Sequence, residues 1–293
     1  MPRLIPRSLN LKNPTEPPYL LGLLGDKRIF RSPSPNMHTS AMHSLNLRGT
    51  YIPLEVEEDS LSELLPALHA LGFLGLNVTA PLKEAVLPHL SEISPLAKKI
   101  GAVNTLLFTS QGFKGFNTDA SGFQDAYLRK RTHPSRALIV GAGGAARAIL
   151  YALIEKGFSP VVTARDPEKG QKLAQEFQGE FLTFDELKEP FPLIVNTTGV
   201  STATEFGKKF KPKLTERGEA VDINYFRKEY LLEKLATQVG GQFYDGKHML
   251  VCQARLSFIQ WTNRTRVSRT SFYNGLDSFR ETIKHSSHKN KGH

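Results

Sequence analysis

The stretch RALIVGAGGAAR, residues 136–147, decides the fold of the second half of this chain of 293 residues. Its first five residues read as a buried β-strand, and the glycines after them read as a tight turn into a helix. Without side chains, glycines let backbone N–H groups and the positive end of a helix approach a pyrophosphate. A second strand-like run, 160–163, follows at βαβ spacing. The stretch predicts a Rossmann-type dinucleotide-binding domain, with cofactor contacts at Gly141, Gly143, Gly144 and Ala145.

The segment after the second strand bears on which nicotinamide nucleotide is bound, because the adenine ribose lies there in such domains. An acidic residue would bind the ribose diol, whereas a basic residue would accept the 2′-phosphate of NADP. The sequence ARDPEK, residues 164–169, offers both. Arg165 can stack on adenine and pair with the phosphate, Lys169 adds a second positive charge, and Asp166 fits the N-cap of the next helix. We predict NADP as the cofactor, with NAD as the alternative.

Short apolar runs alternate with helical periodicity along the middle of the chain, which predicts an α/β fold with mainly parallel strands. An amphipathic helix is expected over 59–71, where leucines recur at spacings of three and four before Gly72. A basic stretch near 123–136 marks the predicted domain boundary. The other predicted strands cover residues 20–24, 50–56, 74–78, 103–108, 193–196 and 220–223.

The formal net charge of +10 lies mostly at the two ends of the chain. Residues 1–14 carry three basic residues and no acidic one, and residues 263–293 carry seven basic and two acidic ones. A nucleic-acid-binding protein carries its basic residues on a folded element among aromatic ones, so we expect solvated tails and no nucleic-acid partner. The single cysteine, Cys252, excludes an intramolecular disulfide. With no signal-peptide pattern, no run long enough to cross a bilayer and only scattered histidines, we expect a cytoplasmic protein without a membrane partner or a metal site.

Four polar blocks flank the glycine turn: NVTAPLK (77–83), GAVNT (101–105), NTDASG (117–122) and MLVCQ (249–253). In this order around GAGGAAR, they closely resemble the shikimate dehydrogenase family, including its quinate/shikimate relatives, over residues 19–262. The resemblance implies a two-domain oxidoreductase that reduces 3-dehydroshikimate to shikimate with NADPH, in the biosynthesis of aromatic amino acids. The substrate would bind in the first domain, and the nicotinamide would reach it across a cleft.

The domain boundaries implied by this resemblance place a Rossmann-type NADP domain inside a discontinuous substrate-binding domain. We expect an N-terminal tail at 1–18, the substrate domain at 19–122 and 246–275, the NADP domain at 123–245, and a basic tail at 276–293.

Two residues match the family's catalytic pair, Lys83 and Asp119. Hydride transfer to a ketone leaves a developing alkoxide, which a protonated amine can stabilise and protonate. A carboxylate would orient that ammonium group. A lysine in the first turn of a helix is otherwise unfavourably placed against the helix dipole, which favours a functional role.

The remaining site residues are implied by position in the same family. Neutral amides and hydroxyls suit a substrate whose ring hydroxyls both donate and accept hydrogen bonds. Capping and turn formation are the alternative roles, above all for the residues just before Pro81 and for the serines at the start of a helix. The expected substrate-binding residues are Ser32, Ser34, Asn77, Thr79, Asn104, Tyr225 and Gln253. The further expected cofactor-binding residues are Arg165, Lys169, Thr197, Gly246 and Met249.

Four segments depart from the family's pattern. The loop 26–31 is one residue longer and ends in Arg31 in place of a common histidine, and the loop 199–203 lacks the usual glycine-methionine ending. Arg227 stands where a proline is usual after the tyrosine. His248 stands where a glycine often precedes the methionine, so its bulk could crowd the nicotinamide. Two alternatives therefore stay open: an NAD-linked quinate/shikimate dehydrogenase, and a catalytically silent binding relative.

Overall fold

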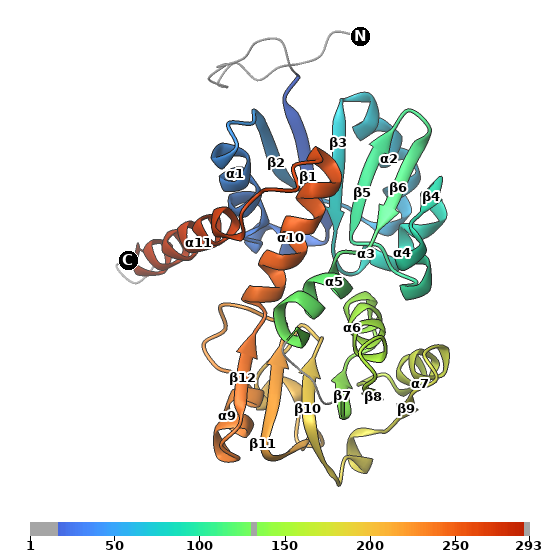
Figure 1. Cartoon of the computed structure of the whole chain (residues 1–293), viewed down its shortest axis with the longest axis vertical. Coiled ribbons are helices and arrows are strands. Elements are labelled where there is room, and N and C mark those ends of the chain that lie inside the picture. The colour runs from blue at the N-terminus through green and yellow to red at the C-terminus, as the bar shows by residue number, and fades with distance from the viewer. Residues whose placement is uncertain (1–16, 130–133, 290–293) are drawn as a thin grey trace. The chain divides into compact units, whose positions relative to one another are not determined.

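The computed structural model describes residues 17–129 and 134–289, which form two compact units. The first unit comprises residues 17–118 and 253–289, and the second comprises residues 119–252 (Figure 1). The second unit is thus inserted into the first one in the sequence. Three stretches of the predicted tails and boundary segment, 1–16, 130–133 and 290–293, lie outside the described residues.

The first unit is built on a six-stranded mixed sheet with the order β2-β1-β3-β5-β6-β4. β1 pairs in parallel with β2 and β3, whereas β5 runs antiparallel to β3 and β6. The start of β5 therefore lies beside the end of β3, with Thr105 opposite Asn77. The predicted strands of this unit are confirmed, while the short β4 and β6 were not predicted. The strands are β1 (Tyr19–Gly25), β2 (Gly49–Glu55), β3 (Phe73–Val78), β4 (Glu92–Ile93), β5 (Thr105–Thr109) and β6 (Gly112–Phe116).

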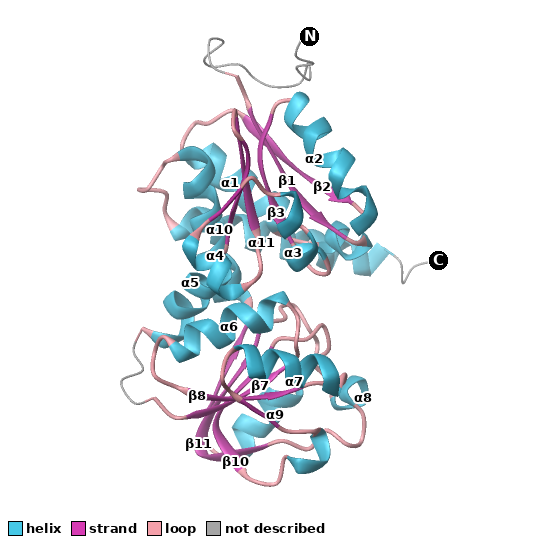
Figure 2. Ribbon diagram, turned by 90° about the vertical axis from the view of Figure 1, so that its right-hand side faces the viewer, coloured by secondary structure: helices cyan, strands magenta, loops and turns pink. Residues whose placement is uncertain are grey.

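Helices cover both faces of this sheet (Figure 2). On one face, the leucines of α2 (Leu61–Ala70) pack with Leu76 of β3 and with residues of α3 (Leu82–Ala85) and α4 (Pro95–Ile100). The helix predicted over 59–71 is confirmed as α2. It ends just before Gly72, whose φ of +87° suits glycine. On the other face lie α1 (Ser34–Ser44) and α10 (Lys247–Thr262). Trp261 of α10 donates from Nε1 to the carbonyl oxygen of Leu106 in β5.

The helix α11 (Arg269–Lys289) covers residues that we had expected to form a tail from 276 onward. Phe272 and Leu276 are buried, and α11 packs along α1. A Cβ at Gly275 would lie 2.4 Å from the carbonyl oxygen of Asn36, so the glycine permits this close approach of two helices. Charge counting missed this packing, because the apolar residues of α11 are spread among its basic ones.

A buried histidine, His38 of α1, lies in the aromatic cluster between α1, α10, α11 and the sheet. It is 0% exposed, stacks on Tyr51 with ring centroids 4.4 Å apart, and meets Phe272 edge-on at 5.6 Å. Among the described residues, neither ring nitrogen has a hydrogen-bonding partner. Burial therefore lowers the pKa of His38 from 6.5 to about 3.

This burial makes the stability of the protein depend on pH through His38. The unfolded chain binds a proton near pH 6.5 but the folded chain only near pH 3, so the contribution is complete above pH 6.5 and is lost as the pH falls toward 3. Urea unfolding at pH 7 and pH 5 should show that His38→Phe removes about 2 kcal/mol of the wild-type loss, since one pKa unit is worth about 1.4 kcal/mol. His38→Gln serves as a second variant without a titrating side chain. If wild type and both variants lost the same free energy of unfolding between pH 7 and pH 5, the assignment to His38 would be wrong.

The second unit is built on a six-stranded sheet with the order β12-β11-β10-β7-β8-β9, in which every recorded pairing is parallel. The central strand β7 is buried on both faces, as the apolar run at its place predicts. The predicted strands are confirmed, and β9 and β12 were not predicted. The strands are β7 (Arg136–Val140), β8 (Ser159–Thr163), β9 (Glu180–Phe181), β10 (Pro190–Asn196), β11 (Lys213–Asp222) and β12 (Gln242–Asp245).

Helices connect these parallel strands. Right-handed crossovers place the helices after β7 and β8 on one face and the helix between β11 and β12 on the other. The segment that leads into the predicted domain boundary forms α5 followed by a π-helical turn over 124–128. The helices are α5 (Asp119–Phe123), α6 (Gly144–Ile154), α7 (Pro167–Glu176), α8 (Ala203–Phe206) and α9 (Leu231–Gln238).

Candidate active site

The carboxyl ends of β7 and β10 form a topological switch point, because the chain runs outward from β7 to β9 and then returns to β10 on the other side of β7. Ligands of open parallel sheets bind outside the strands at such a point. Gly141 follows β7 with a φ of +119°, and a Cβ there would lie 2.5 Å from Oγ1 of Thr197. Thr197 follows β10 and donates from its hydroxyl to the carbonyl oxygen of Val140, 2.8 Å away. The structure thus brings two predicted cofactor residues together.

The start of α6 has room for a phosphate. Gly143 is the N-cap of this 11-residue helix and supplies no side-chain cap. A Cβ at Gly143 would meet nothing within 4 Å, so the space beside the turn is open. Gly144 and Ala145 form the first turn and are half-buried. The positive end of α6 and this open turn fit the pyrophosphate of a dinucleotide.

The end of β8 carries the residues that we expected to select the nucleotide. Arg165 and Lys169 are both exposed. Asp166 is the N-cap of α7 and accepts a hydrogen bond from the backbone N–H of Lys169 at 3.2 Å, with Pro167 as the first helical residue. The expected capping role of Asp166 is therefore confirmed. This carboxylate serves the helix, while the guanidinium of Arg165 remains open to a ligand.

A buried carboxylate organises the loops that follow β10 and β11. Asp222 accepts hydrogen bonds from the side-chain amides of Asn196 at 2.9 Å and Asn224 at 2.7 Å. Burial raises the pKa of this carboxyl group above its ordinary value, while these hydrogen bonds oppose the rise. Tyr225, which we expected at the substrate carboxylate, follows this network and meets Phe226 edge-on at 5.7 Å.

Two departures from the family's pattern turn out to be in contact with each other. Arg227 donates from Nη2 to the carbonyl oxygen of Gly199, and its Nη1 lies 3.7 Å from the carboxylate of Glu205. That carboxylate also accepts from the backbone N–H groups of Ser201 and Thr202, which hold the pKa of Glu205 below its usual value. Arg227, the unusual loop 199–203 and the start of α8 are therefore joined by hydrogen bonds and an ion pair.

The start of α10 places the last two expected cofactor residues. Gly246 is buried, and a Cβ there would lie 1.9 Å from the carbonyl oxygen of Ile223, so only glycine fits. Met249 is 6% exposed, and its backbone N–H lies 3.4 Å from the hydroxyl of Tyr127. The ring of His248 packs against Tyr127 with centroids 6.3 Å apart.

In the first unit, three of the expected site residues, Thr79, Lys83 and Asn104, lie near the carboxyl ends of β1 and β3. Thr79 follows β3, and a Cβ at Gly25, where β1 ends, would lie 2.5 Å from Cγ2 of Thr79. Half-buried Lys83 lies on α3, and its carbonyl oxygen accepts from the backbone N–H of Val103 at 2.8 Å. This bond ties the lysine's turn to the segment that leads through Asn104 into β5. The antiparallel pairing of β3 and β5 thus brings blocks that are distant in the sequence to one place.

Asn104 is 3% exposed and lies in a dense hydrogen-bond network. Its Nδ2 donates to the hydroxyl of Thr118 at 2.9 Å and to Oε1 of Gln253 at 3.4 Å. Its Oδ1 accepts from the backbone N–H of Thr118 at 2.8 Å. Asp119, the other member of the expected catalytic pair, is the next residue and is 5% exposed. The network thus reaches the residue directly before the expected catalytic carboxylate.

Asn77 has a clear structural role. Its Nδ2 donates to the carbonyl oxygen of Asn104 and to the hydroxyl of Ser257, both at 3.0 Å, and its Oδ1 accepts from the hydroxyl of Tyr51 at 2.8 Å. Direct contact of Asn77 with a substrate hydroxyl stays a prediction, while its support of Asn104 is visible in these hydrogen bonds.

The serine pair lies at the start of α1. Ser34 is the first residue of the helix, which confirms the expected helix start, and it is 7% exposed. The hydroxyl of Ser32 lies 3.0 Å from that of Ser34 and accepts from the backbone N–H of Ser34 at 3.2 Å. The two hydroxyls therefore converge, as a pair that binds a carboxylate requires.

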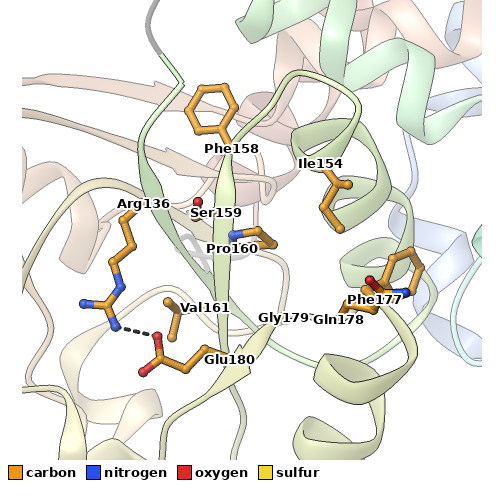
Figure 3. Close-up of a pocket in the computed structure, with 10 residues that line it drawn as sticks. All are labelled: Arg136, Ile154, Phe158, Ser159, Pro160, Val161, Phe177, Gln178, Gly179 and Glu180. Atoms are coloured by element: carbon orange, nitrogen blue, oxygen red, sulfur yellow. Dashed lines mark hydrogen bonds and ion pairs between the residues drawn. The ribbon is translucent and has the colours of Figure 1, made fainter.

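A hollow in the second unit lies at the wrong end of the sheet for a nucleotide (Figure 3). Arg136 and Ser159, which line it, are the first residues of β7 and β8, whereas the glycine turn follows the last residue of β7. An ion pair between Arg136 and Glu180 at 2.6 Å occupies the hollow. This hollow therefore lies away from the switch point, where ligands of open parallel sheets bind.

The second unit has a parallel sheet with a glycine turn at its switch point, and the first unit has a lysine and amides at one end of its strands. Together in one chain, these features define a two-domain NAD(P)-dependent oxidoreductase. The chain belongs to the shikimate dehydrogenase family. Residues 23–106 match the shikimate dehydrogenase substrate binding domain, and residues 126–208 match shikimate / quinate 5-dehydrogenase. A shikimate dehydrogenase (NADP+) from Carboxydothermus hydrogenoformans is 36% identical over 247 residues, which cover 78% of this chain and 86% of that protein.

Solved structures agree with this assignment. Shikimate 5-dehydrogenase from Thermus thermophilus, in complex with NADP(H) and shikimate, is 33% identical with a TM-score of 0.77 and covers 89% of this chain and 99% of its own. Quinate dehydrogenase from Corynebacterium glutamicum, in complex with NAD, is 28% identical with the same TM-score and covers the same shares of the two chains.

Within 17–129 and 134–289, no helix is both long and apolar enough to cross a membrane. In the same ranges, no three His, Cys, Asp or Glu side chains group as metal ligands.

Proposed function

We propose that this chain reduces 3-dehydroshikimate to shikimate reversibly with NADPH, with Lys83 as the group that protonates the substrate oxygen. The chain is an oxidoreductase of the shikimate dehydrogenase (NADP+) family that acts on a CH–OH group. One observation carries the residue assignment. The backbone N–H of Val103 donates to the carbonyl oxygen of Lys83, and this bond holds the turn of Lys83 beside the segment that contains Asn104. A cation and an amide at one edge suit a ring that carries both a carbonyl and hydroxyl groups.

The reaction needs a hydride at the carbonyl carbon and a proton at its oxygen. When bound, NADPH supplies the hydride. The ammonium of Lys83 stabilises the negative charge that develops on the oxygen and then donates the proton, which becomes the new hydroxyl hydrogen. Asp119, buried directly after Thr118, holds and orients that ammonium group. In the reverse direction, neutral Lys83 accepts the hydroxyl proton.

The other residues bind and orient the two reactants. The paired hydroxyls of Ser32 and Ser34, with Tyr225, bind the substrate carboxylate. Thr79, Asn104 and Gln253 bind the ring hydroxyls. Asn77 holds Asn104 in place through the hydrogen bond from its Nδ2 to the carbonyl oxygen of Asn104. The cofactor is held by the turn Gly141–Gly144 with Ala145 at its pyrophosphate, by Arg165 and Lys169 at the 2′-phosphate, and by Thr197, Gly246 and Met249 at the nicotinamide end.

A second candidate function is oxidation of quinate with NAD, which the likeness to the Corynebacterium protein supports. Quinate carries an extra hydroxyl on the carbon that bears the carboxylate, so the serine pair would have to accommodate it. Ser32 is half-buried, and its Oγ lies 3.0 Å from that of Ser34. A third candidate, a silent binding relative, is disfavoured because both Lys83 and Asp119 are retained.

Initial rates with shikimate and quinate, each with NADP and NAD, test the proposed function. We expect the highest kcat/KM for shikimate with NADP. A higher value for quinate with NAD would favour the second function. Saturable binding of shikimate without reduction of either nucleotide would show a silent relative.

A further inference from the structure

Ser257 lies at the centre of the polar network behind Asn104, although no motif of the sequence indicated it. It is on α10, 0% exposed, four residues after Gln253. Its hydroxyl oxygen lies 2.7 Å from that of Thr105 and 3.0 Å from that of Thr118. It accepts from Nδ2 of Asn77 at 3.0 Å and donates to the carbonyl oxygen of Gln253 at 3.1 Å. One serine on a helix thus reaches β3, β5 and the segment between β6 and α5.

The two threonine hydroxyls each have two acceptors within reach. Besides Ser257, both contact Oδ1 of Asn104, at 3.0 Å from Thr105 and 3.2 Å from Thr118. That oxygen already accepts from the backbone N–H of Thr118. An amide oxygen has two lone pairs, so it can take one of the two hydroxyls in addition. The hydroxyl of Ser257 takes the other one.

We propose that Ser257 is a positioning residue that fixes the orientation of the Asn104 amide for the substrate. Without the serine hydroxyl, three donors compete for the two lone pairs of Asn104 Oδ1. One buried donor is then left unsatisfied, or the amide turns to relieve the conflict. A turned amide would place Oδ1, an acceptor, where Nδ2 now donates to Oε1 of Gln253, and so would disturb two of the expected substrate-binding side chains. This inference rests on the proposed role of Asn104 in substrate binding.

Ser257→Ala should therefore raise the KM for shikimate about three- to tenfold, the effect of losing one hydrogen bond, and should leave the KM for NADP unchanged. The matched control is Ser271→Ala. Ser271 is also buried in the first unit, at 8% exposure, and its hydroxyl donates to that of Ser44 at 2.9 Å, on α1 and not in the Asn104 network. Both variants lose a buried hydroxyl and should lower the Tm, but we expect a change in the KM for shikimate only for Ser257→Ala.

A compensating substitution distinguishes positioning from general loss of stability. Thr105→Val keeps the shape of a fully buried side chain and removes one of the competing hydroxyl donors. In the Ser257→Ala background, it should return the KM for shikimate toward the wild-type value, because two donors again face two lone pairs. The Tm of the double variant should fall further, because one acceptor of Asn77 is also lost.

Three outcomes would overturn the proposal. The first is an unchanged KM for shikimate in Ser257→Ala, whatever the change in its Tm. The second is a KM that rises further in the double variant. The third is an unchanged KM in Asn104→Ala, which would show that Asn104 does not bind the substrate although the enzyme is active. Failure of the proposed function looks different, because the wild-type protein would then not turn over shikimate at all.

Discussion

Lys83→Ala should lower kcat by a factor of about 10² to 10⁴, which is the usual contribution of a proton-transfer group, while the affinity for shikimate hardly changes. The ammonium group acts on negative charge that develops mainly in the transition state, so its loss affects the barrier more than ground-state binding. The structure supports this role because the turn of Lys83 is fixed to the segment of Asn104 by the bond from Val103 N–H to Lys83 O. Steady-state rates and shikimate binding, measured on the same preparation, check both parts.

The matched control is Lys98→Ala, because Lys98 is an exposed lysine on another short helix of the same unit. It should retain wild-type kcat. Lys83→Arg keeps the positive charge but not a proton that can be transferred, so it should bind shikimate and turn over slowly. Asp119→Asn should also lower kcat. A loss of kcat below about tenfold in Lys83→Ala would remove Lys83 from the proton-transfer role.

The nucleotide-binding turn could be predicted because its chemistry is local. Gly141 needs a positive φ, and three glycines after a buried strand leave few alternatives. The partner of this turn could not be predicted from the same stretch. Thr197, which lies 56 residues further on, contacts Gly141 only because β10 returns to pair with β7. The order of strands, and not any local pattern, creates that contact.

The expected substrate-binding residues of the first unit show the same contrast between local patterns and contacts made by the fold. Lys83, Asn104 and Gln253 could be predicted as site residues because they belong to blocks that resemble a family. Ser257 could not be, because a serine inside an apolar helix carries no signal of its own. It becomes important only through the register that sets Thr105 opposite Asn77. The contact of Arg227 with residues 199–205 could not be predicted for the same reason, because neither departure from the family's pattern indicates by itself that it contacts the other.

The choice of nucleotide was the most ambiguous feature of the sequence, and the structure separates its two candidate residues. Asp166 is occupied as the N-cap of α7, with its Oδ1 on the backbone N–H of Lys169. Asp166→Ala should therefore cost about 1 kcal/mol of stability, as the loss of an N-cap does, without a shift in nucleotide preference. If Asp166 instead faced the ribose hydroxyls, the same substitution would weaken NAD and improve NADP.

Arg165→Ala should raise the KM for NADP by one to two orders of magnitude and leave the kinetics with NAD almost unchanged. The side chain of Arg165 is exposed just after β8, where the adenine ribose of a dinucleotide lies, and its planar guanidinium can pair with a 2′-phosphate while it stacks on adenine. Hydrogen bonds to charged groups contribute about 1.5–3 kcal/mol each, which sets the size of the effect. Values of kcat/KM for both nucleotides, in wild type, Arg165→Ala and Asp166→Ala, separate the two roles. A wild-type preference for NAD, or an equal loss with both nucleotides in Arg165→Ala, would show that the arginine does not read the 2′-phosphate.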